Sequence, residues 1–172
     1  MGRKTTFDKP KKRKRGNKKK QLINNSSIDV LYNNINGLLS KQDSLCHIIQ
    51  MKQPDLVTLC ETKLHKNSNF DIQGYNVIHS NLKAGKEGIL VAAKQGTFNS
   101  IEKTYEAESR NIATVEIEYP EDTLSVVVVH GPQEEAQQEV REEFYEDLKA
   151  EVERCVAGGN RLLITGDFNA RT

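Results

Sequence analysis

The sequence predicts an α/β fold, with one globular domain that follows a basic tail. Short apolar runs such as Asp55–Cys60, Thr123–Val129 and Leu162–Thr165 have the composition of buried strands. Two segments with helical periodicity, Ser40–Lys52 and Gln133–Val156, lie between such runs. The chain has 172 residues, of which 36% are hydrophobic, and this is enough for one domain with a buried core.

The first 27 residues differ in charge from the rest of the chain. Residues 1–20 contain 11 Lys or Arg and one Asp, whereas the remainder contains 14 basic and 23 acidic residues. We therefore expect residues 1–27 to form a disordered tail and residues 28–172 to fold. The run KPKKRKRGNKKK is typical of a nuclear-localisation signal or of a sequence-independent contact with phosphates. DNA is the expected partner of residues 1–20, with RNA or another polyanion as alternatives, or a solvated tail that binds nothing specific.

Hydropathy and cysteine usage limit the cellular setting. No apolar run approaches 18 residues, and no apolar segment follows the basic start, so neither a membrane span nor a secretory signal is expected. Cys46, Cys60 and Cys155 are widely spaced and odd in number, which fits neither a zinc site nor a disulfide framework. We expect free thiols in a reducing compartment, the nucleus or the cytosol. The sequence carries no signal for an oligomeric state.

The first half of the domain has the order strand, helix, strand. Ile28–Tyr32 is rich in β-prone residues, Ser40–Lys52 is helical with Ser40 as its expected N-cap, and Asp55–Cys60 is a second apolar strand. The expected buried stripe of the helix consists of Leu45, Ile48 and Ile49. This βαβ-like order predicts that Asn34 and Glu61, which follow the two strands, lie at one edge of a sheet.

The second half predicts further strands and one long helix. The expected strands are Gly74–Ser80, Glu87–Ala93, Asn111–Glu118 and Thr123–Val129, with a turn at Asn81–Lys86. Asn111–Glu118 alternates apolar and polar residues, so we expect one of its faces to be wet. The helix Gln133–Val156 is expected to bury Val140, Phe144, Leu148 and Val152, which recur at i+4. Its nine acidic residues between Glu134 and Glu153 are expected to form a solvated face.

Four of these strands end in polar residues that can do chemistry. Asn34 and Asn36 follow the first strand, Glu61 the second, and His130 ends Thr123–Val129. Each has an ordinary alternative: an Asn-Gly turn, an exposed Glu that opens a loop, or the end of a strand. Four such ends in one α/β chain favour a site for a divalent cation and an anionic substrate.

The fourth strand end is the sequence GDFN at Gly166–Asn169. In extended geometry Asp167 and Asn169 would point the same way, with Phe168 directed to the core. The alternative is an Asx turn that closes the strand. Together with Glu61, these carboxylate and amide oxygens suit Mg²⁺, or Mn²⁺, more than zinc, and they fit hydrolysis of a phosphate ester by a metal and a positioned water.

The order of these motifs resembles the endonuclease/exonuclease/phosphatase family, which includes the DNase-I-like and abasic-site endonucleases. The motifs are Asn34–Gly37, Glu61–Thr62, Gly88–Ile89, His130–Pro132 and Gly166–Ala170. The wording NINGL and GDFNAR is most similar to the endonuclease domain of LINE-type (non-LTR) retrotransposons. The resemblance covers Ile28–Thr172 and implies an α/β fold in which a sandwich of two β-sheets is flanked by helices.

The resemblance also implies a role for each matching residue. Glu61 would bind Mg²⁺ with Asn34 in support, Asp167 would orient and deprotonate the attacking water, and Asn169 would contact the scissile phosphate. His130 stands where the family usually has a Tyr, and its imidazole can donate a hydrogen bond to a phosphate oxygen. LINE members of the family nick target DNA so that reverse transcription can be primed.

The family pattern continues past GDFNA with further strands, another Asp and a late Ser-Asp-His, none of which these 172 residues contain. The resemblance therefore implies a C-terminally incomplete domain with an exposed edge strand near Leu162–Thr165 and weak or no nuclease activity as a single polypeptide. One alternative is a catalytically dead nucleic-acid-binding remnant that acts through its basic tail. Another is a phosphatase of the same superfamily, against which the basic tail argues.

Overall fold

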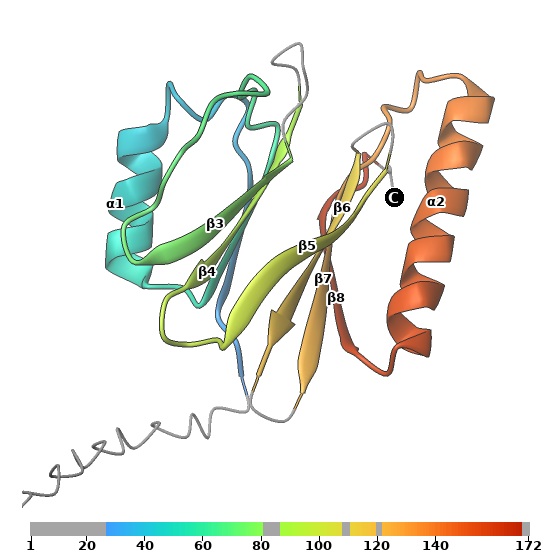
Figure 1. The fold of residues 1–172 in the computed structure, drawn as a ribbon. Coiled ribbons are helices and arrows are strands. Elements are labelled where there is room, and N and C mark those ends of the chain that lie inside the picture. The colour runs from blue at the N-terminus through green and yellow to red at the C-terminus, as the bar shows by residue number, and fades with distance from the viewer. Residues whose placement is uncertain (1–26, 81–86, 108–110, 120–121, 170–172) are drawn as a thin grey trace, which may run out of the picture.

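In the residues that the computed structural model describes (27–80, 87–107, 111–119 and 122–169), eight strands form two sheets that face each other (Figure 1). The strands of the first sheet are β1 (Val30–Asn34), β2 (Leu56–Cys60), β3 (Tyr75–Ser80) and β4 (Ile89–Lys94). Those of the second are β5 (Ser100–Glu106), β6 (Ile112–Glu118), β7 (Thr123–His130) and β8 (Arg161–Asp167). The predicted tail, apart from Ser27, and the predicted turn Asn81–Lys86 lie outside the described residues.

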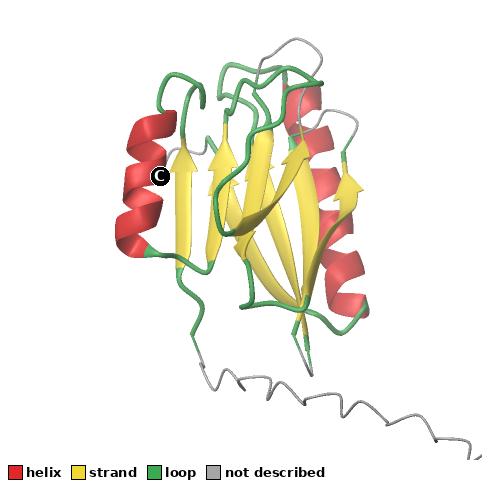
Figure 2. Ribbon diagram, turned by 60° about the vertical axis from the view of Figure 1, so that its left-hand side comes forward, coloured by secondary structure: helices red, strands yellow, loops and turns green. Residues whose placement is uncertain are grey.

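One helix covers the outer face of each sheet, so the predicted two-sheet sandwich flanked by helices is confirmed (Figure 2). α1 (Gln42–Lys52) packs on the first sheet through Leu45 and Ile49, and α2 (Gln138–Ala157) packs on the second through Phe144 and Cys155. A third apolar layer fills the space between the sheets and includes Leu56, Val91, Val115 and Val126. Burial of this middle layer fixes the distance between the two sheets.

Each sheet has one parallel pair at one end, and these pairs position the candidate site. The strand order is β1-β2-β4-β3 in the first sheet and β5-β6-β7-β8 in the second. β1 runs parallel to β2 with Asn34 opposite Cys60, as the βαβ order predicted. β7 runs parallel to β8 with His130 opposite Asp167. Parallel strands end at the same edge of a sheet, so the polar residues at these ends are brought together in pairs.

β8 forms an edge of the second sheet, and this agrees with the exposed edge expected near Leu162–Thr165. Ile164 is 38% exposed, and Val30 and Tyr32 of the neighbouring edge strand β1 are 40% and 37% exposed. The sandwich therefore shows apolar side chains along one side of its described part.

Two features of the second sheet differ from the sequence prediction. The strand β5 was not predicted, because SIEKTYE contains no apolar run and most of its side chains are exposed or half-buried. It is held by antiparallel pairing with β6, with a bulge between Lys103 and Tyr105. The predicted wet face of β6 holds only at the end of the strand: Glu116 is half-buried and Glu118 exposed, whereas Thr114 is fully buried where α2 packs over the sheet.

Both helices begin later than predicted. α1 starts at Gln42, and the Ser40 hydroxyl donates a hydrogen bond to the Gly37 carbonyl at 3.0 Å instead of capping the helix. Its expected buried residue Ile48 is 40% exposed. α2 starts at Gln138, and Val140 is 42% exposed, which leaves Phe144 as the first buried residue of its stripe. No helix in the described part of the chain is long and apolar enough to cross a membrane.

Glu151 departs from the expected solvated acidic face of α2. Its side chain is only 3% exposed, and both carboxylate oxygens accept hydrogen bonds from Arg154, at 2.8 and 2.9 Å. Burial disfavours the charged form, but the hydrogen bonds and positive charge of Arg154 outweigh it and lower the pKa of Glu151. Arg154 also contacts Glu116 and Thr104 of the second sheet, so the ionised pair helps to hold α2 on that sheet.

We expect Glu151→Gln to lower the free energy of unfolding by about 2 kcal/mol at pH 7, because the neutral amide has one oxygen and can accept only one of the two hydrogen bonds from Arg154. A carboxyl group whose pKa is lowered on folding stabilises the protein above its ordinary pKa, here 4.5, and this contribution is lost as the pH falls through the lowered value. The loss should therefore shrink markedly at pH 3. Urea unfolding at both pH values measures it, with the exposed Glu153→Gln as the control. An equal loss at both pH values would contradict the assignment.

Candidate functional site

The side-chain amide of Asn34 bridges two carboxylates from distant parts of the chain. Its Nδ2 donates hydrogen bonds to Glu61 Oε1 at 2.8 Å and to Asp167 Oδ2 at 3.0 Å. Asn34 and Glu61 come from the first sheet and Asp167 from the second, so the bridge joins the two sheets. The structure thus brings three of the residues selected from the sequence into direct contact.

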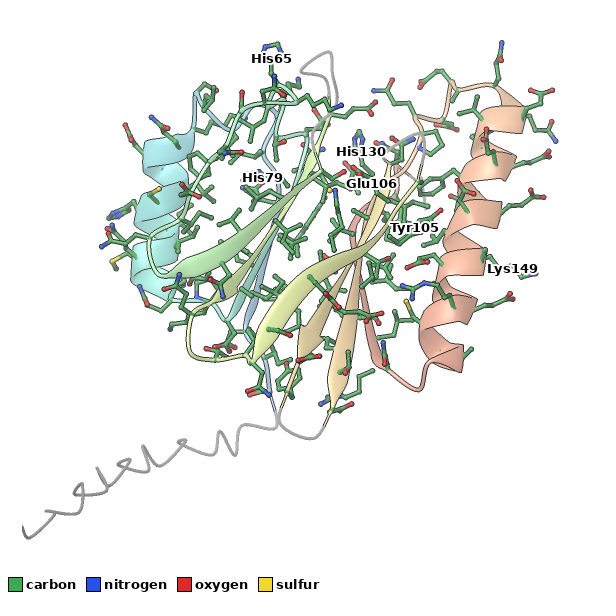
Figure 3. The ribbon with its side chains drawn as sticks, viewed as in Figure 1. His65, His79, Tyr105, Glu106, His130 and Lys149 are labelled. Carbon is green, nitrogen blue, oxygen red and sulfur yellow. The ribbon has the colours of Figure 1, made fainter. Side chains whose placement is uncertain are left out.

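His130 completes this group from the end of β7. Its Nε2 lies 3.4 Å from Glu61 Oε1, and its side chain is only 13% exposed. Figure 3 shows His130 at the edge of the second sheet where it faces the first. An imidazole in this place can donate a hydrogen bond to Glu61 or to a bound anion, but not to both from the same nitrogen.

Asp167 and Asn169 form the Asx turn that the sequence left open as an alternative. The Asn169 main-chain N–H donates to Asp167 Oδ1 at 3.0 Å, so only Oδ2 of Asp167 faces Asn34. The hydrogen bonds from Asn169 and Asn34 lower the pKa of Asp167. Burial opposes them with a smaller effect, and the nearby His130 lowers the pKa by a still smaller amount. Asp167 is therefore ionised at neutral pH.

Two expectations about this turn were wrong. Asn169 has a φ of 47° and not the extended backbone that would align it with Asp167; its Nδ2 donates to the Gly131 carbonyl at 2.7 Å. Phe168 does not point into the core, since it is 37% exposed. The physical reason is the Asx hydrogen bond, which turns the chain directly after β8.

The backbone near the site is held in unusual conformations. Asn36, Glu61, Lys63 and Asn169 all have positive φ, between 45° and 53°. Such conformations cost energy for residues other than Gly and cluster at functional sites, where the surrounding structure must impose them. Here hydrogen bonds from Gly37 N to Glu61 O, at 2.8 Å, and from Gly131 N to Asp167 O, at 2.6 Å, join the loops that follow the strands.

Gly166 allows β7 and β8 to approach closely just before the site. A Cβ atom built at Gly166 would lie 1.9 Å from the Val129 carbonyl oxygen, so no larger residue fits there without movement of the backbone. Cys60 makes a further link, since its Sγ donates to the same Val129 oxygen at 3.2 Å and joins β2 to β7. Burial raises the pKa of Cys60 to about 11, which keeps it a thiol at neutral pH.

Two lysines at the site were missed by the sequence analysis. Lys63 Nζ lies 3.6 Å from Glu61 Oε2 and donates a hydrogen bond to Asn36 Oδ1. Lys41 Nζ donates to the main-chain oxygens of Ile35, at 2.5 Å, and Asn36, at 3.4 Å. The sequence did offer a signal for Lys63, which is its position two residues after Glu61.

The residues present fit a hard divalent cation such as Mg²⁺. Asn34 Oδ1 is buried and has no hydrogen-bond partner in the described part of the chain, and it lies on the same amide that bridges Glu61 and Asp167. This unpaired amide oxygen and the two carboxylates are hard oxygen donors of the kind that such an ion prefers. Among the described residues, no three His, Cys, Asp or Glu side chains form a metal-holding group. Mg²⁺ commonly uses one or two carboxylates and keeps several waters.

The fold and this site define a class of protein: a two-sheet α/β sandwich with an acidic, amide-bridged site where parallel edge strands end. The chain belongs to the endonuclease/exonuclease/phosphatase family, and the match to that family covers residues 34–171. The family expected from the motifs is therefore confirmed. The match begins at Asn34 and includes Glu61, His130, Asp167 and Asn169.

Individual relatives agree with this assignment. The chain is 30% identical to exodeoxyribonuclease III of Haemophilus influenzae in an alignment 148 residues long, and the match covers 79% of this chain and 55% of the relative. The structure is similar to an AP endonuclease from Archaeoglobus fulgidus (TM-score 0.68, 16% identity, 84% of this chain and 58% of that chain). It is also similar to a 3′ phosphatase, NExo, from Neisseria bound to product DNA hairpin (TM-score 0.64, 16% identity, 83% of this chain and 58% of that chain). The chain thus spans little more than half the length of these proteins.

We expect Asn34→Asp to destabilise the fold by about 2 kcal/mol at pH 7, because it removes both hydrogen bonds of the bridge and adds a third carboxylate. The like charges raise the pKa values of the group, so the loss should diminish as the pH falls and the carboxylates become protonated. Urea unfolding at pH 7 and pH 4 measures this.

Asn33→Asp adds the same charge to the neighbouring exposed position of β1 and serves as the control. If Asn33→Asp and Asn34→Asp have the same effect at both pH values, the bridge contributes nothing to the stability of the site.

Proposed function

We propose that this chain carries the metal-binding and water-positioning part of a Mg²⁺-dependent phosphodiesterase that nicks DNA. The observation that carries the proposal is the amide of Asn34 placed between the carboxylates of Glu61 and Asp167. One amide donor holds two negatively charged groups close to each other, and carboxylates so placed favour a bound cation. Membership of the nuclease and phosphatase family supports the same chemistry.

Each residue then has a defined part in hydrolysis. Glu61 and Asn34 Oδ1 would hold the cation, which when bound supplies positive charge next to the phosphate. Asp167 is ionised and has Oδ2 directed into the site, so it can accept a hydrogen bond from the attacking water and take its proton. His130, near Glu61, can donate to a phosphate oxygen.

Asn169 has a different starting position from the one expected. Its amide nitrogen is bound to the Gly131 carbonyl, so the side chain braces the loop after β7 in this structure. A contact with the scissile phosphate would have to use that amide after it leaves Gly131. We therefore assign Asn169 a primary role in holding the turn at Asp167 and a secondary role in binding the phosphate of the substrate.

DNA is the proposed substrate, for reasons of charge and similarity. Residues 1–20 contain 11 Lys or Arg, and a segment of this charge binds phosphates without regard to sequence. The Neisseria 3′ phosphatase is bound to a DNA hairpin, and the other relatives are an exodeoxyribonuclease and an AP endonuclease. The wording NINGL and GDFNAR supports a retrotransposon endonuclease of LINE type that acts in the nucleus. The late Asp and Ser-Asp-His of the family pattern are not among these 172 residues, so we propose weak nicking by this polypeptide alone.

Supercoiled plasmid incubated with the 172-residue chain at low salt should relax slowly with Mg²⁺ and remain supercoiled with a chelator. Asp167→Asn should reduce the rate by about 100-fold, because it removes the group that takes the proton. Asp43→Asn, an exposed acidic residue in the first turn of α1, is the matched control and should nick at the parent rate.

Nicking by Asp167→Asn at the parent rate would refute the assigned site. Binding of DNA without nicking at any metal concentration would favour the catalytically dead remnant. Release of phosphate from a 3′-phosphorylated oligonucleotide, without relaxation of plasmid, would favour a phosphatase.

Replacing residues 1–20 with an uncharged Gly/Ser segment of equal length should weaken DNA binding and flatten its salt dependence. The reason is that each phosphate neutralised by Lys or Arg releases counterions, which sets the slope of log K against log salt. Fluorescence anisotropy with a labelled duplex between 50 and 200 mM salt measures the slope for both chains. An unchanged slope would show that the basic segment does not contact DNA.

A further inference from the structure

Lys63 is the cationic side chain that faces the outer oxygen of Glu61. Its Nζ lies 3.6 Å from Glu61 Oε2, and it also donates to Asn36 Oδ1. The side chain of Lys63 is 43% exposed and that of Glu61 is 24% exposed, so solvent reaches the pair. The ammonium of Lys63 is therefore close to the carboxylate of Glu61 but exposed enough to move away from it.

The two oxygens of Glu61 have different surroundings. Oε1 accepts from Asn34 Nδ2 and lies near His130, whereas Oε2 faces only Lys63 among the contacts seen in the described residues. An ammonium at this distance partly neutralises the carboxylate and opposes the approach of a second cation. Lys63 in this position therefore competes for Glu61 with the divalent cation of the proposed function.

The local backbone keeps Lys63 in this position. Glu61 and Lys63 both have positive φ, at 52° and 53°, and Lys63 N donates to Glu87 O at 2.6 Å. These constraints hold the backbone of Lys63 where its side chain contacts Glu61 and Asn36. A strained backbone on both residues indicates that the pairing is imposed by the fold and is not a chance surface contact.

We propose that Lys63 is a positioning residue that acts as the counter-ion of Glu61 in the metal-free site and gives way when a divalent cation binds. The inference rests on the proposed function, because it takes Glu61 as a metal ligand. Lys63 would keep the two carboxylates from repelling each other in the free protein, and its displacement would weaken the apparent affinity for the cation. Removal of the lysine charge must then strengthen metal binding, whereas loss of a residue that merely shapes the site would weaken it.

Lys41, the second lysine near the site, differs from Lys63 because it makes no contact with a carboxylate in the described part of the chain. Its ammonium is also on this turn, but its hydrogen bonds go to the main-chain oxygens of Ile35 and Asn36 and not to a carboxylate. Lys41 therefore stabilises the backbone at Ile35 and Asn36, and its charge does not neutralise Glu61 directly.

The test is a titration of the full chain with Mn²⁺ alone, in which free Mn²⁺ is measured by electron paramagnetic resonance at pH 7.5 and low salt. Lys63→Gln removes the charge but keeps a donor for Asn36, and it should bind Mn²⁺ about three- to tenfold more tightly than the parent. Lys63→Arg keeps the charge and should bind like the parent. Lys52→Gln, at the far end of α1, loses the same charge and should also bind like the parent.

Lys63→Met, which also removes the hydrogen bond to Asn36, should change the affinity in the same direction as Lys63→Gln, and circular dichroism checks that both variants are folded. In 0.5 M salt the gain should become smaller, because screening weakens the interaction between exposed charges. Binding by Lys63→Gln that equals or falls below that of the parent would overturn this inference and leave the proposed function standing. Failure of the parent and of Lys63→Gln to bind Mn²⁺ would overturn both.

Discussion

The site depends on one amide group placed between two carboxylates. Asn34 Nδ2 is the common donor to Glu61 and Asp167, which come from different sheets and are separated by more than a hundred residues of sequence. Two carboxylates so close repel each other, and a neutral donor offsets only part of that repulsion. The fold must therefore supply further compensation, and most of the unusual features of the structure lie around this contact.

Two kinds of interaction offset the repulsion: contacts that fix the backbone of the strand ends, and positive charge near Glu61. The close approach of β7 and β8 at Gly166 and the thiol contact of Cys60 with Val129 hold the strand ends in place. His130 and Lys63 bring positive or potentially positive groups to Glu61 on opposite oxygens. These contacts hold the two strand ends together around the Asn34 bridge and place charges of opposite sign next to the carboxylates.

Family membership and the site answer different questions. The match over residues 34–171 assigns the family and the two-sheet fold, and both are shared by nucleases and phosphatases. Fold alone does not select a reaction, because related sites on one scaffold act on different phosphate esters. The proposal of DNA nicking rests on the Asn34 bridge together with the basic residues 1–20.

The sequence by itself determined the class of fold, the order of the strands' polar ends and the identity of the residues that meet there. Short apolar runs followed by Asn34, Glu61, His130 and Asp167 are local patterns, and parallel pairing of the strands brings such ends to one edge. The family resemblance followed from the same short sequence motifs.

Only the tertiary structure decided how those residues are arranged. The strand β5 has no apolar run and exists through its pairing with β6, and Thr114 on the polar face of β6 is buried because α2 packs over it. The contact of Lys63 with Glu61 follows from left-handed backbone conformations at both residues, which hydrogen bonds from Gly37 N to Glu61 O and from Lys63 N to Glu87 O hold in place. Such conformations are unfavourable in an isolated segment, so their cause lies in contacts between distant residues and not in the local sequence.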